Sequence, residues 1–237
     1  MRPGPDAPRL TYLRWEQAWR IIASRYPPID LFERVSDDPA VWDVLMELEQ
    51  LTNPRVRDAV GTIRLVPPPR RVSGPNASWA MAPFTHINPK GSRFSDGTLG
   101  VYYAANRLET AIHETVHHFA RFARDSGDPP RREDMRVLVG TVDHLFHDVA
   151  TLPVGERARV LDPDSYGVSR ALAHWLRDAG SDGITYPSVR DPDGTCVAAF
   201  WPDVVDIPRQ ERHLKYEWDG RRVSRYFDYG SDQWVTL

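Results

Sequence analysis

Residues 91–118, GSRFSDGTLGVYYAANRLETAIHETVHH, contain the transition that decides the fold. The run over 99–105 is apolar and rich in Val and Tyr, which predicts a strand. Asn106 is followed three positions later by Glu109, the spacing of a capping box, so we expect a helix that begins there and runs to about Arg124. A strand that passes directly into a helix of this length is typical of a mixed α and β domain.

Turn residues and hydrophobic periodicity predict further elements on both sides of this stretch. Upstream, we expect helices over 12–25, over 38–51 and from 53 onward, then strands over 62–66 and 79–84. Downstream, we expect a strand over 135–142, a helix over 166–179 ended by Gly180, strands over 183–189 and 196–201, and a hairpin over 213–229 that turns at Asp219-Gly220. The fold class is therefore α+β, in a single domain.

The composition excludes several classes of protein. The chain has 237 residues, of which 41% are hydrophobic, and this is ordinary for one globular domain. A formal net charge of -3 provides no excess of cations for a phosphate backbone, so direct nucleic-acid binding is not expected. The start of the sequence lacks a signal pattern, no apolar run approaches ~20 residues, and Cys196 is the single cysteine, so we expect a cytoplasmic protein with no membrane segment.

Residues 113–117, HETVH, match the HExxH pattern of zinc hydrolases, in which two histidines bind the metal and the glutamate activates water. Such sites need a third protein ligand. The downstream Glu133 is available, but it follows a Pro-Pro break and not an evident second helix. A zinc-dependent hydrolase that uses His113, Glu114 and His117 therefore stays open as an alternative.

Helical spacing places Glu114 on the polar side of its helix, roughly 140° from the centre of the apolar face. This position is either a solvated face or a site covered by another element. Arg93, in a loop flanked by Gly and Ser, is one candidate to meet Glu114, because the planar guanidinium suits phosphate; it is equally suited to pinning its own loop. Ser188, which follows Pro187 at a strand end, is another candidate, although no GxSxG nucleophile motif surrounds it.

Tyr102 and Tyr103 are neighbours in the strand predicted over 99–105. Successive side chains of a strand point to opposite faces, so one of these rings is expected in the core and the other is available to a ligand. Two ordinary strand aromatics are the alternative interpretation.

Taken together, these stretches resemble the RES family, named for an Arg, a Glu and a Ser. The resemblance is carried by residues 91–118 and by 182–202, DGITYPSVRDPDGTCVAAFWP, with weaker similarity at 19–35 and 47–66. It implies a fold like that of diphtheria-toxin-type ADP-ribosyltransferases, with small mixed sheets, flanking helices and an NAD cleft. Within one domain, it implies an N-terminal helical portion over 1–77 and a catalytic core over 78–237. The sequence departs from the commoner GRWN form of the Arg loop by having Ser92 to Ser95 as SRFS.

Carried over by position, the resemblance implies catalytic roles for Arg93, Tyr103, Glu114 and Ser188, and substrate contacts from Ser92, Tyr102, His118 and Arg190. It implies no metal and no cofactor: NAD+ is a substrate, with inorganic phosphate as a further candidate co-substrate. The expected activity is that of an NAD+ glycohydrolase or NAD+ phosphorylase, the toxin of a bacterial type II toxin-antitoxin pair. An ADP-ribosyltransferase acting on a protein is a second alternative. The expected partner is an Xre-like antitoxin that occludes the active site, and homo-oligomerisation stays open.

Overall fold

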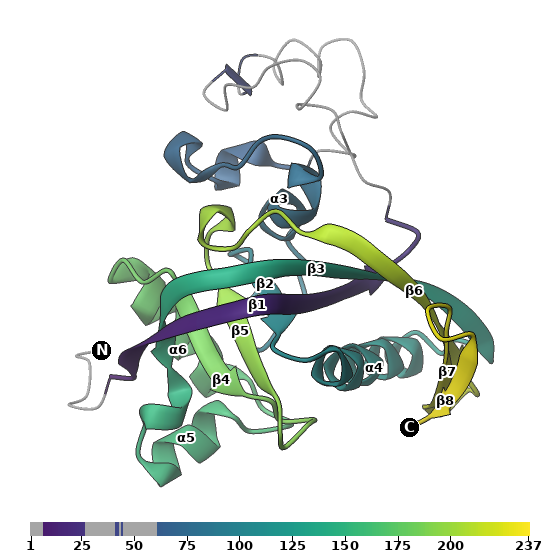
Figure 1. Ribbon diagram of the computed structural model, residues 1–237. Coiled ribbons are helices and arrows are strands. Elements are labelled where there is room, and N and C mark those ends of the chain that lie inside the picture. Colours follow the sequence, from purple (N-terminus) through teal and green to yellow (C-terminus); the bar gives the residue numbers. More distant parts are fainter. Residues whose placement is uncertain (1–6, 27–40, 43, 45–60) are drawn as a thin grey trace.

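The computed structural model describes residues 7–26, 41–42, 44 and 61–237, and its strands form one connected, curved sheet (Figure 1). In spatial order the strands run β1-β2-β5-β4-β3-β6-β7-β8, with a further pairing between β1 and β3. Their bounds are Arg9–Ala23 (β1), Tyr102–Ala105 (β2), Arg131–Asp148 (β3), Gly183–Pro187 (β4), Thr195–Ala199 (β5), Arg209–Trp218 (β6), Val223–Asp228 (β7) and Gln233–Thr236 (β8).

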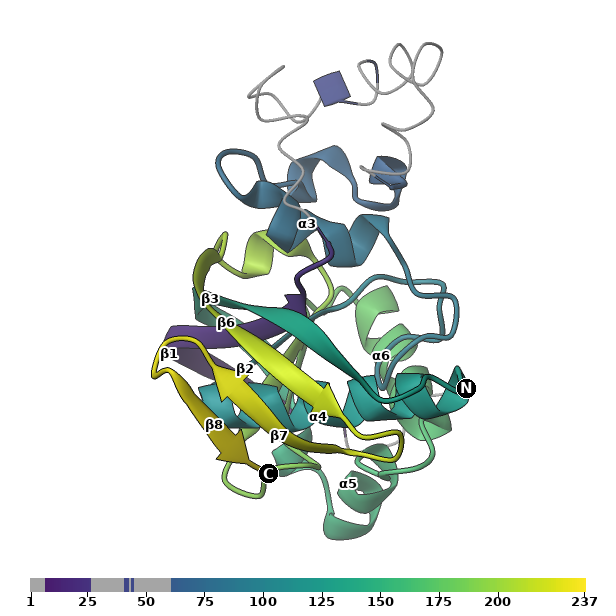
Figure 2. The same cartoon turned by 90° about the vertical axis from the view of Figure 1, so that its right-hand side faces the viewer.

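Strand β3 connects the two halves of this sheet. One of its edges pairs with β1 from Met135 to Asp148, and the opposite edge pairs with β6 near its start and with β4 only at its last two residues. Because β6 and β4 share that edge at different ends, the sheet divides there. The β6–β8 part curls away from the β2–β5–β4 part, as the two views show (Figures 1 and 2).

Helices cover both faces of the strands and enclose two hydrophobic clusters. The α-helices are α3 (Ala77–Thr85), α4 (Leu108–Asp125), α5 (Val154–Val160) and α6 (Gly167–Asp178), and the short 3-10 helices are η2 (Ile63–Leu65), η3 (Pro68–Arg70), η4 (Val149–Thr151) and η5 (Pro202–Val204). Helix α3 lies on one side of β1 and β3, and α4 lies on the other (Figures 1 and 2). The larger cluster contains Ile112 and Ala123 of α4, and the second contains Met81 and Phe84 of α3.

Most elements predicted downstream of residue 99 are confirmed. The helices expected over 106–124 and 166–179 are α4 and α6, and the strand over 135–142 is the middle of the longer β3. The strands over 183–189 and 196–201 are β4 and β5, and the hairpin at Asp219-Gly220 joins β6 to β7. The α+β class is confirmed in consequence.

The helix predicted over 12–25 is wrong, because β1 occupies Arg9–Ala23. The register of β1 against β3 shifts between Trp15 and Ala18. This bulge puts Trp15 and Ala18 against the same cluster three residues apart, and Trp19 and Ile21 against the other. A bulge inserts one residue and reverses which side chains face each side of the sheet. Two residues three positions apart then share a face, as they do in a helix. The helical description of residues 1–77 is therefore wrong for this segment, while the boundary at residue 77 stays a prediction.

Two other local predictions fail. The run over 62–66 contains the 3-10 helix η2, and the run over 79–84 lies in α3. A short apolar run has no periodicity that separates strand from helix. The proposed capping box also fails: Arg107 is the N-cap of α4, and Asn106 Oδ1 accepts from the backbone N–H of Thr195 at 2.9 Å. The helices predicted over 38–51 and from 53 lie almost wholly outside the described residues. Within the described residues, no helix is both long enough and apolar enough to cross a bilayer.

Candidate active site

A cavity of about 380 Å³ opens between α4, strands β1 and β2, and the loop before β2. Arg93, Tyr103 and Glu114 all line it, although they come from a loop, a strand and a helix. The other polar or aromatic residues that line it are Trp19, Arg20, Asn88, Lys90, Ser92, Thr115, His118, Arg121, Phe122, Asp125, Tyr166, Arg170 and Tyr186. The polar face of α4 is therefore covered here and does not face open solvent at Glu114.

Glu114 is held by a serine that lies 74 positions further along the chain. Ser188 Oγ donates to Glu114 Oε1 at 2.7 Å. Within the described part of the chain, Glu114 Oε2 has no hydrogen-bond partner, so this oxygen can accept from a ligand hydroxyl. His118, the residue expected to set the direction of the carboxylate, makes no hydrogen bond to it among the described residues.

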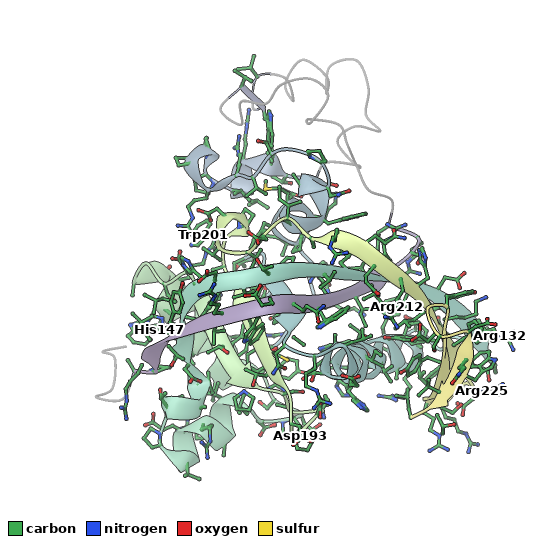
Figure 3. All side chains as sticks on the ribbon, in the orientation of Figure 1. Arg132, His147, Asp193, Trp201, Arg212 and Arg225 are labelled. Carbon is green, nitrogen blue, oxygen red and sulfur yellow. The ribbon has the colours of Figure 1, made fainter. Side chains whose placement is uncertain are left out.

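The loop between β4 and β5 holds Ser188 in turn. Ser188 Oγ accepts the backbone N–H groups of Arg190 (3.1 Å) and Asp191 (3.0 Å), and Asp191 accepts a hydrogen bond from Thr110 of α4 at 2.6 Å. Asp193 marks the tip of this loop below the strands (Figure 3). Ser188 is buried and does not itself line the cavity, so it meets the site through Glu114.

Tyr103 joins β2 to the loop that carries Arg93. Its hydroxyl accepts the N–H of Phe94 at 3.0 Å and shares a 2.7 Å hydrogen bond with Ser92 Oγ. Burial raises the pKa of Tyr103 to about 12, so the phenol stays protonated at neutral pH. Its backbone carbonyl accepts from Arg20 at 3.0 Å, which brings β1 into the same wall of the cavity.

Arg93 lies buried beside the cavity with its guanidinium held on one side. Nη1 donates to the carbonyl of Val160, the last residue of α5, at 3.3 Å and to that of Asp162, just after α5, at 2.8 Å. The guanidinium carbon lies 4.6 Å from the centre of the Tyr166 ring. The carbonyl of Arg93 itself accepts from Ser169 of α6 at 2.7 Å. Arg93 thus pins its loop and also presents a charge to the cavity.

The cavity wall is strongly cationic. Five cations line it, Arg20, Lys90, Arg93, Arg121 and Arg170, against the two carboxylates of Glu114 and Asp125. No ion pair within the described residues involves any of these five cations. Unpaired cations grouped at one concave surface are the arrangement that attracts an anionic ligand.

Two histidines of α4, His117 and His118, are electrically neutral at physiological pH. Desolvation, together with the positive charge of Arg190, lowers the pKa of His118 and of His117 to about 4 each. Arg190 Nη2 donates to His117 Nε2 at 3.0 Å and to the carbonyl of Pro163 at 2.9 Å, and Arg190 does not line the cavity. A neutral His118 places no positive charge beside the carboxylate of Glu114.

Tyr102 does not reach the cavity, which corrects the expectation that it contacts a substrate. It is 2% exposed and packs in the second cluster, on the face of β2 opposite Tyr103. The alternation of strand side chains is the physical reason.

Arg20 and Tyr166 are site residues that the sequence analysis did not single out. Arg20 lies in the weakly matching stretch 19–35, whereas nothing in the sequence marks Tyr166.

The zinc alternative receives no support from the geometry. No group of three His, Cys, Asp or Glu side chains that could hold a metal ion exists among the described residues. His113 is exposed, and the Nε2 lone pair of His117 accepts from Arg190. Cys196 also lines the cavity, but burial raises the pKa of its thiol, so it is not a thiolate nucleophile.

Known proteins similar to this chain cover most of its length. The uncharacterized protein y4oC of Sinorhizobium fredii (strain NBRC 101917 / NGR234) is 28% identical over 214 residues, 90% of this chain and 88% of that protein. Among solved structures, a chain of the M. tuberculosis MbcT-MbcA toxin-antitoxin complex matches 88% of this chain and 87% of its own length at 11% identity, with a TM-score of 0.40 that is too low to indicate a shared function. The family model described as RES domain matches residues 68–219, which is more than half of the chain and includes Arg93, Tyr103, Glu114 and Ser188. The chain therefore belongs to the RES domain family.

Proposed function

We propose that this protein is an enzyme that cleaves the bond between nicotinamide and ribose in NAD+, and that it acts as the toxin of a toxin-antitoxin pair. One observation carries the enzymatic part of the proposal. Arg93 and Glu114 line the same cavity, and the Tyr103 hydroxyl accepts a hydrogen bond from the loop that carries Arg93. The cavity is therefore shared by the cationic and the anionic side chain. Its volume of about 380 Å³ lies within the ordinary range of small-molecule sites.

Glycosidic cleavage of NAD+ requires stabilisation of a positively charged sugar. As the C1′–N bond breaks, its electron pair neutralises the nicotinamide nitrogen and leaves an oxocarbenium-like ribose. Glu114 supplies the opposing negative charge, and Ser188 holds one of its carboxylate oxygens at 2.7 Å. The second oxygen accepts from a ribose hydroxyl. Water then adds to C1′ and releases one proton, which gives ADP-ribose.

The cationic wall suits the diphosphate of the dinucleotide. Arg93 uses Nη1 on two backbone carbonyls, which leaves Nη2 and Nε to donate to phosphate oxygens. Arg20, on β1, also lines the cavity and adds a second guanidinium. Fixing the diphosphate at one end holds the ribose at Glu114, which reduces the entropy cost of reaching the transition state.

Tyr103 provides an aromatic surface for the nicotinamide, since its ring lines the cavity while its hydroxyl is occupied by Ser92 and Phe94. A neutral His118 in the same wall avoids repulsion of the positively charged nicotinamide ring. Tyr103 and His118 therefore belong to the substrate-binding wall in this proposal, and Ser188 and Arg190 act from behind it.

The biological role rests on family resemblance. Resemblance to the RES family implies a cytoplasmic toxin with an ADP-ribosyltransferase-like fold and an Xre-like antitoxin that occludes the cavity. It also implies that the acceptor of the ADP-ribosyl group is water, phosphate or a protein. We propose each of these properties for this chain. The occluding partner would present acidic groups, because the cavity mouth is cationic.

Incubation of the purified protein with NAD+, with and without inorganic phosphate, tests the proposal, with products identified by mass. Free nicotinamide with ADP-ribose, or with its phosphorylated form, is the expected result and identifies the acceptor. Expression with and without the candidate antitoxin tests toxicity, with the cellular NAD+ level measured in parallel. Intact NAD+ in both experiments would overturn the proposal.

A further inference from the structure

Three arginines surround a single aromatic ring at the cavity. The guanidinium carbons of Arg93, Arg121 and Arg170 lie 4.6, 5.6 and 5.9 Å from the centre of the Tyr166 ring. All four residues line the cavity; Arg93 and Arg121 come from two other segments, whereas Arg170 lies one helical turn after Tyr166 at the start of α6. An aromatic face attracts a guanidinium without cancelling its charge. Tyr166 therefore gathers positive charge and leaves it available.

Arginines elsewhere in the described residues are commonly neutralised. Arg132 and Arg225 both pair with Glu217, and Arg212 pairs with Glu211 and Asp228; all three arginines lie on the β6–β8 side (Figure 3). The arginines around Tyr166 have no such carboxylate within the described residues. Three like charges converge there and are only partly offset, by Asp162 near Arg93 and by Asp125 in the cavity wall, so a ligand that supplies negative charge is favoured.

The three arginines are not equivalent. Arg93 and Arg170 donate to backbone carbonyls, Arg93 to Val160 and Asp162, and Arg170 to Ser92 (3.0 Å) and Lys90 (3.1 Å). Arg121, on α4, makes no hydrogen bond and no ion pair to any described residue, and its contact with Tyr166 is the one that orients it. Its whole guanidinium edge is therefore available to an anion.

We propose that Arg121 and Arg170, held by Tyr166, form a second phosphate subsite that binds a phosphate dianion beside the diphosphate site at Arg93. The inference rests on the proposed function and extends it. A phosphomonoester or inorganic phosphate carries about −1.5 to −2 charge at pH 7, and the five cations of the cavity exceed its two carboxylates by more than this charge.

This chemistry has two sources in the cell. One is the 2′-phosphate of NADP+, which would make NADP+ a preferred substrate over NAD+. The other is free inorganic phosphate bound next to the dinucleotide. Both use the same guanidinium groups, so the experiment needs separate arms for the two sources.

Calorimetric titration of the Glu114→Gln protein in a phosphate-free buffer tests the subsite without turnover. One arm compares ADP-ribose with ADP-ribose 2′-phosphate, and the other adds inorganic phosphate to protein saturated with ADP-ribose. We expect a preference of roughly tenfold for the 2′-phosphate, or saturable phosphate binding, that is lost in the additional Arg121→Gln variant. The first pattern assigns the subsite to NADP+, and the second assigns it to free phosphate.

Two controls separate this role from general effects of charge and folding. Arg124→Gln removes a cation from the same helix, but Arg124 does not line the cavity, so it should leave both titrations unchanged. Tyr166→Phe keeps the ring and should keep the preference, whereas Tyr166→Leu should lose it.

Equal affinity for the two nucleotides together with no phosphate binding would overturn the subsite, even if NAD+ is cleaved. Retention of both signals in Arg121→Gln would overturn the assignment to Arg121. Failure of the proposed function would appear differently, as intact NAD+ with the unmodified protein, while the titrations would still report on phosphate binding.

Discussion

Ser188 Oγ donates a 2.7 Å hydrogen bond to Glu114 Oε1, although 74 positions separate the two residues along the chain. The serine is 8% exposed and its hydroxyl also accepts two backbone N–H groups. A hydroxyl with this many partners cannot rotate freely, so the carboxylate it touches has a fixed orientation toward the cavity.

Replacement of Glu114 by Gln removes the negative charge and keeps the shape of the side chain. We expect NAD+ cleavage to fall by about 10²–10³-fold, because the charge acts on the transition state and not on the bound substrate. Nicotinamide release measures the loss. Glu109→Gln is the matched control, since Glu109 is an exposed carboxylate on the same helix that pairs with Arg107. Full activity of Glu114→Gln would contradict the mechanism.

Ser188→Ala should lower both stability and kcat. It leaves the N–H groups of Arg190 and Asp191 without their acceptor, which costs about 1–3 kcal/mol of unfolding free energy. It also releases Glu114, so kcat should fall while KM stays near its original value. Ser181→Ala is the comparison, because Ser181 is also buried and accepts the N–H of Gly183, but its hydroxyl bonds to His147 and Gly183 and not to Glu114. If both variants lose kcat equally, Ser188 has no positioning role.

Tyr103→Phe should impair activity more than Tyr102→Phe. The Tyr103 hydroxyl holds Phe94 and Ser92, so its loss loosens the loop that presents Arg93 and should raise the KM for NAD+ several-fold. The Tyr102 hydroxyl has no hydrogen bond to any described residue, and its ring packs away from the cavity. Steady-state kinetics of the two variants measure the difference, and equal KM values would contradict the placement of Tyr103.

The protein should lose stability as the pH falls from about 6.5 toward 4. In the folded protein, desolvation and Arg190 hold the pKa of His118 at about 4, against an ordinary value of 6.5. Between these values the unfolded chain binds a proton that the folded chain does not, so acid favours unfolding, and above pH 6.5 this contribution is constant. Thermal unfolding at several pH values measures the slope. His118→Asn should flatten it, and an unchanged slope would refute the assigned pKa.

Metal removal should leave NAD+ cleavage intact. His113 is exposed and His117 accepts from Arg190, so neither is arranged to bind zinc. Treatment with a chelator, followed by a nicotinamide assay, should show no loss, and His113→Gln should remain active. Stoichiometric zinc in the purified protein, together with inactivation by the chelator, would favour the zinc hydrolase instead.

The sequence by itself determined the elements whose signals are local. Helix α4 and helix α6 have clear apolar stripes, and the hairpin between β6 and β7 has Asp219-Gly220 at its turn, so each was predictable without knowledge of its neighbours. The identities of Arg93, Glu114 and Ser188 also came from sequence, through resemblance to a family and not through any physical property of one segment.

Only the tertiary structure decided which of these residues meet. The apolar spacing in β1 resembles that of a helix because a bulge against β3 reverses the alternation of its side chains. That bulge exists only when the two strands pair. Tyr166 reaches Arg93 and Arg121 from another segment, and Ser188 reaches Glu114 through the β4–β5 loop. Contacts between residues far apart in sequence depend on how sheets and helices pack, and short-range periodicity carries no information about them.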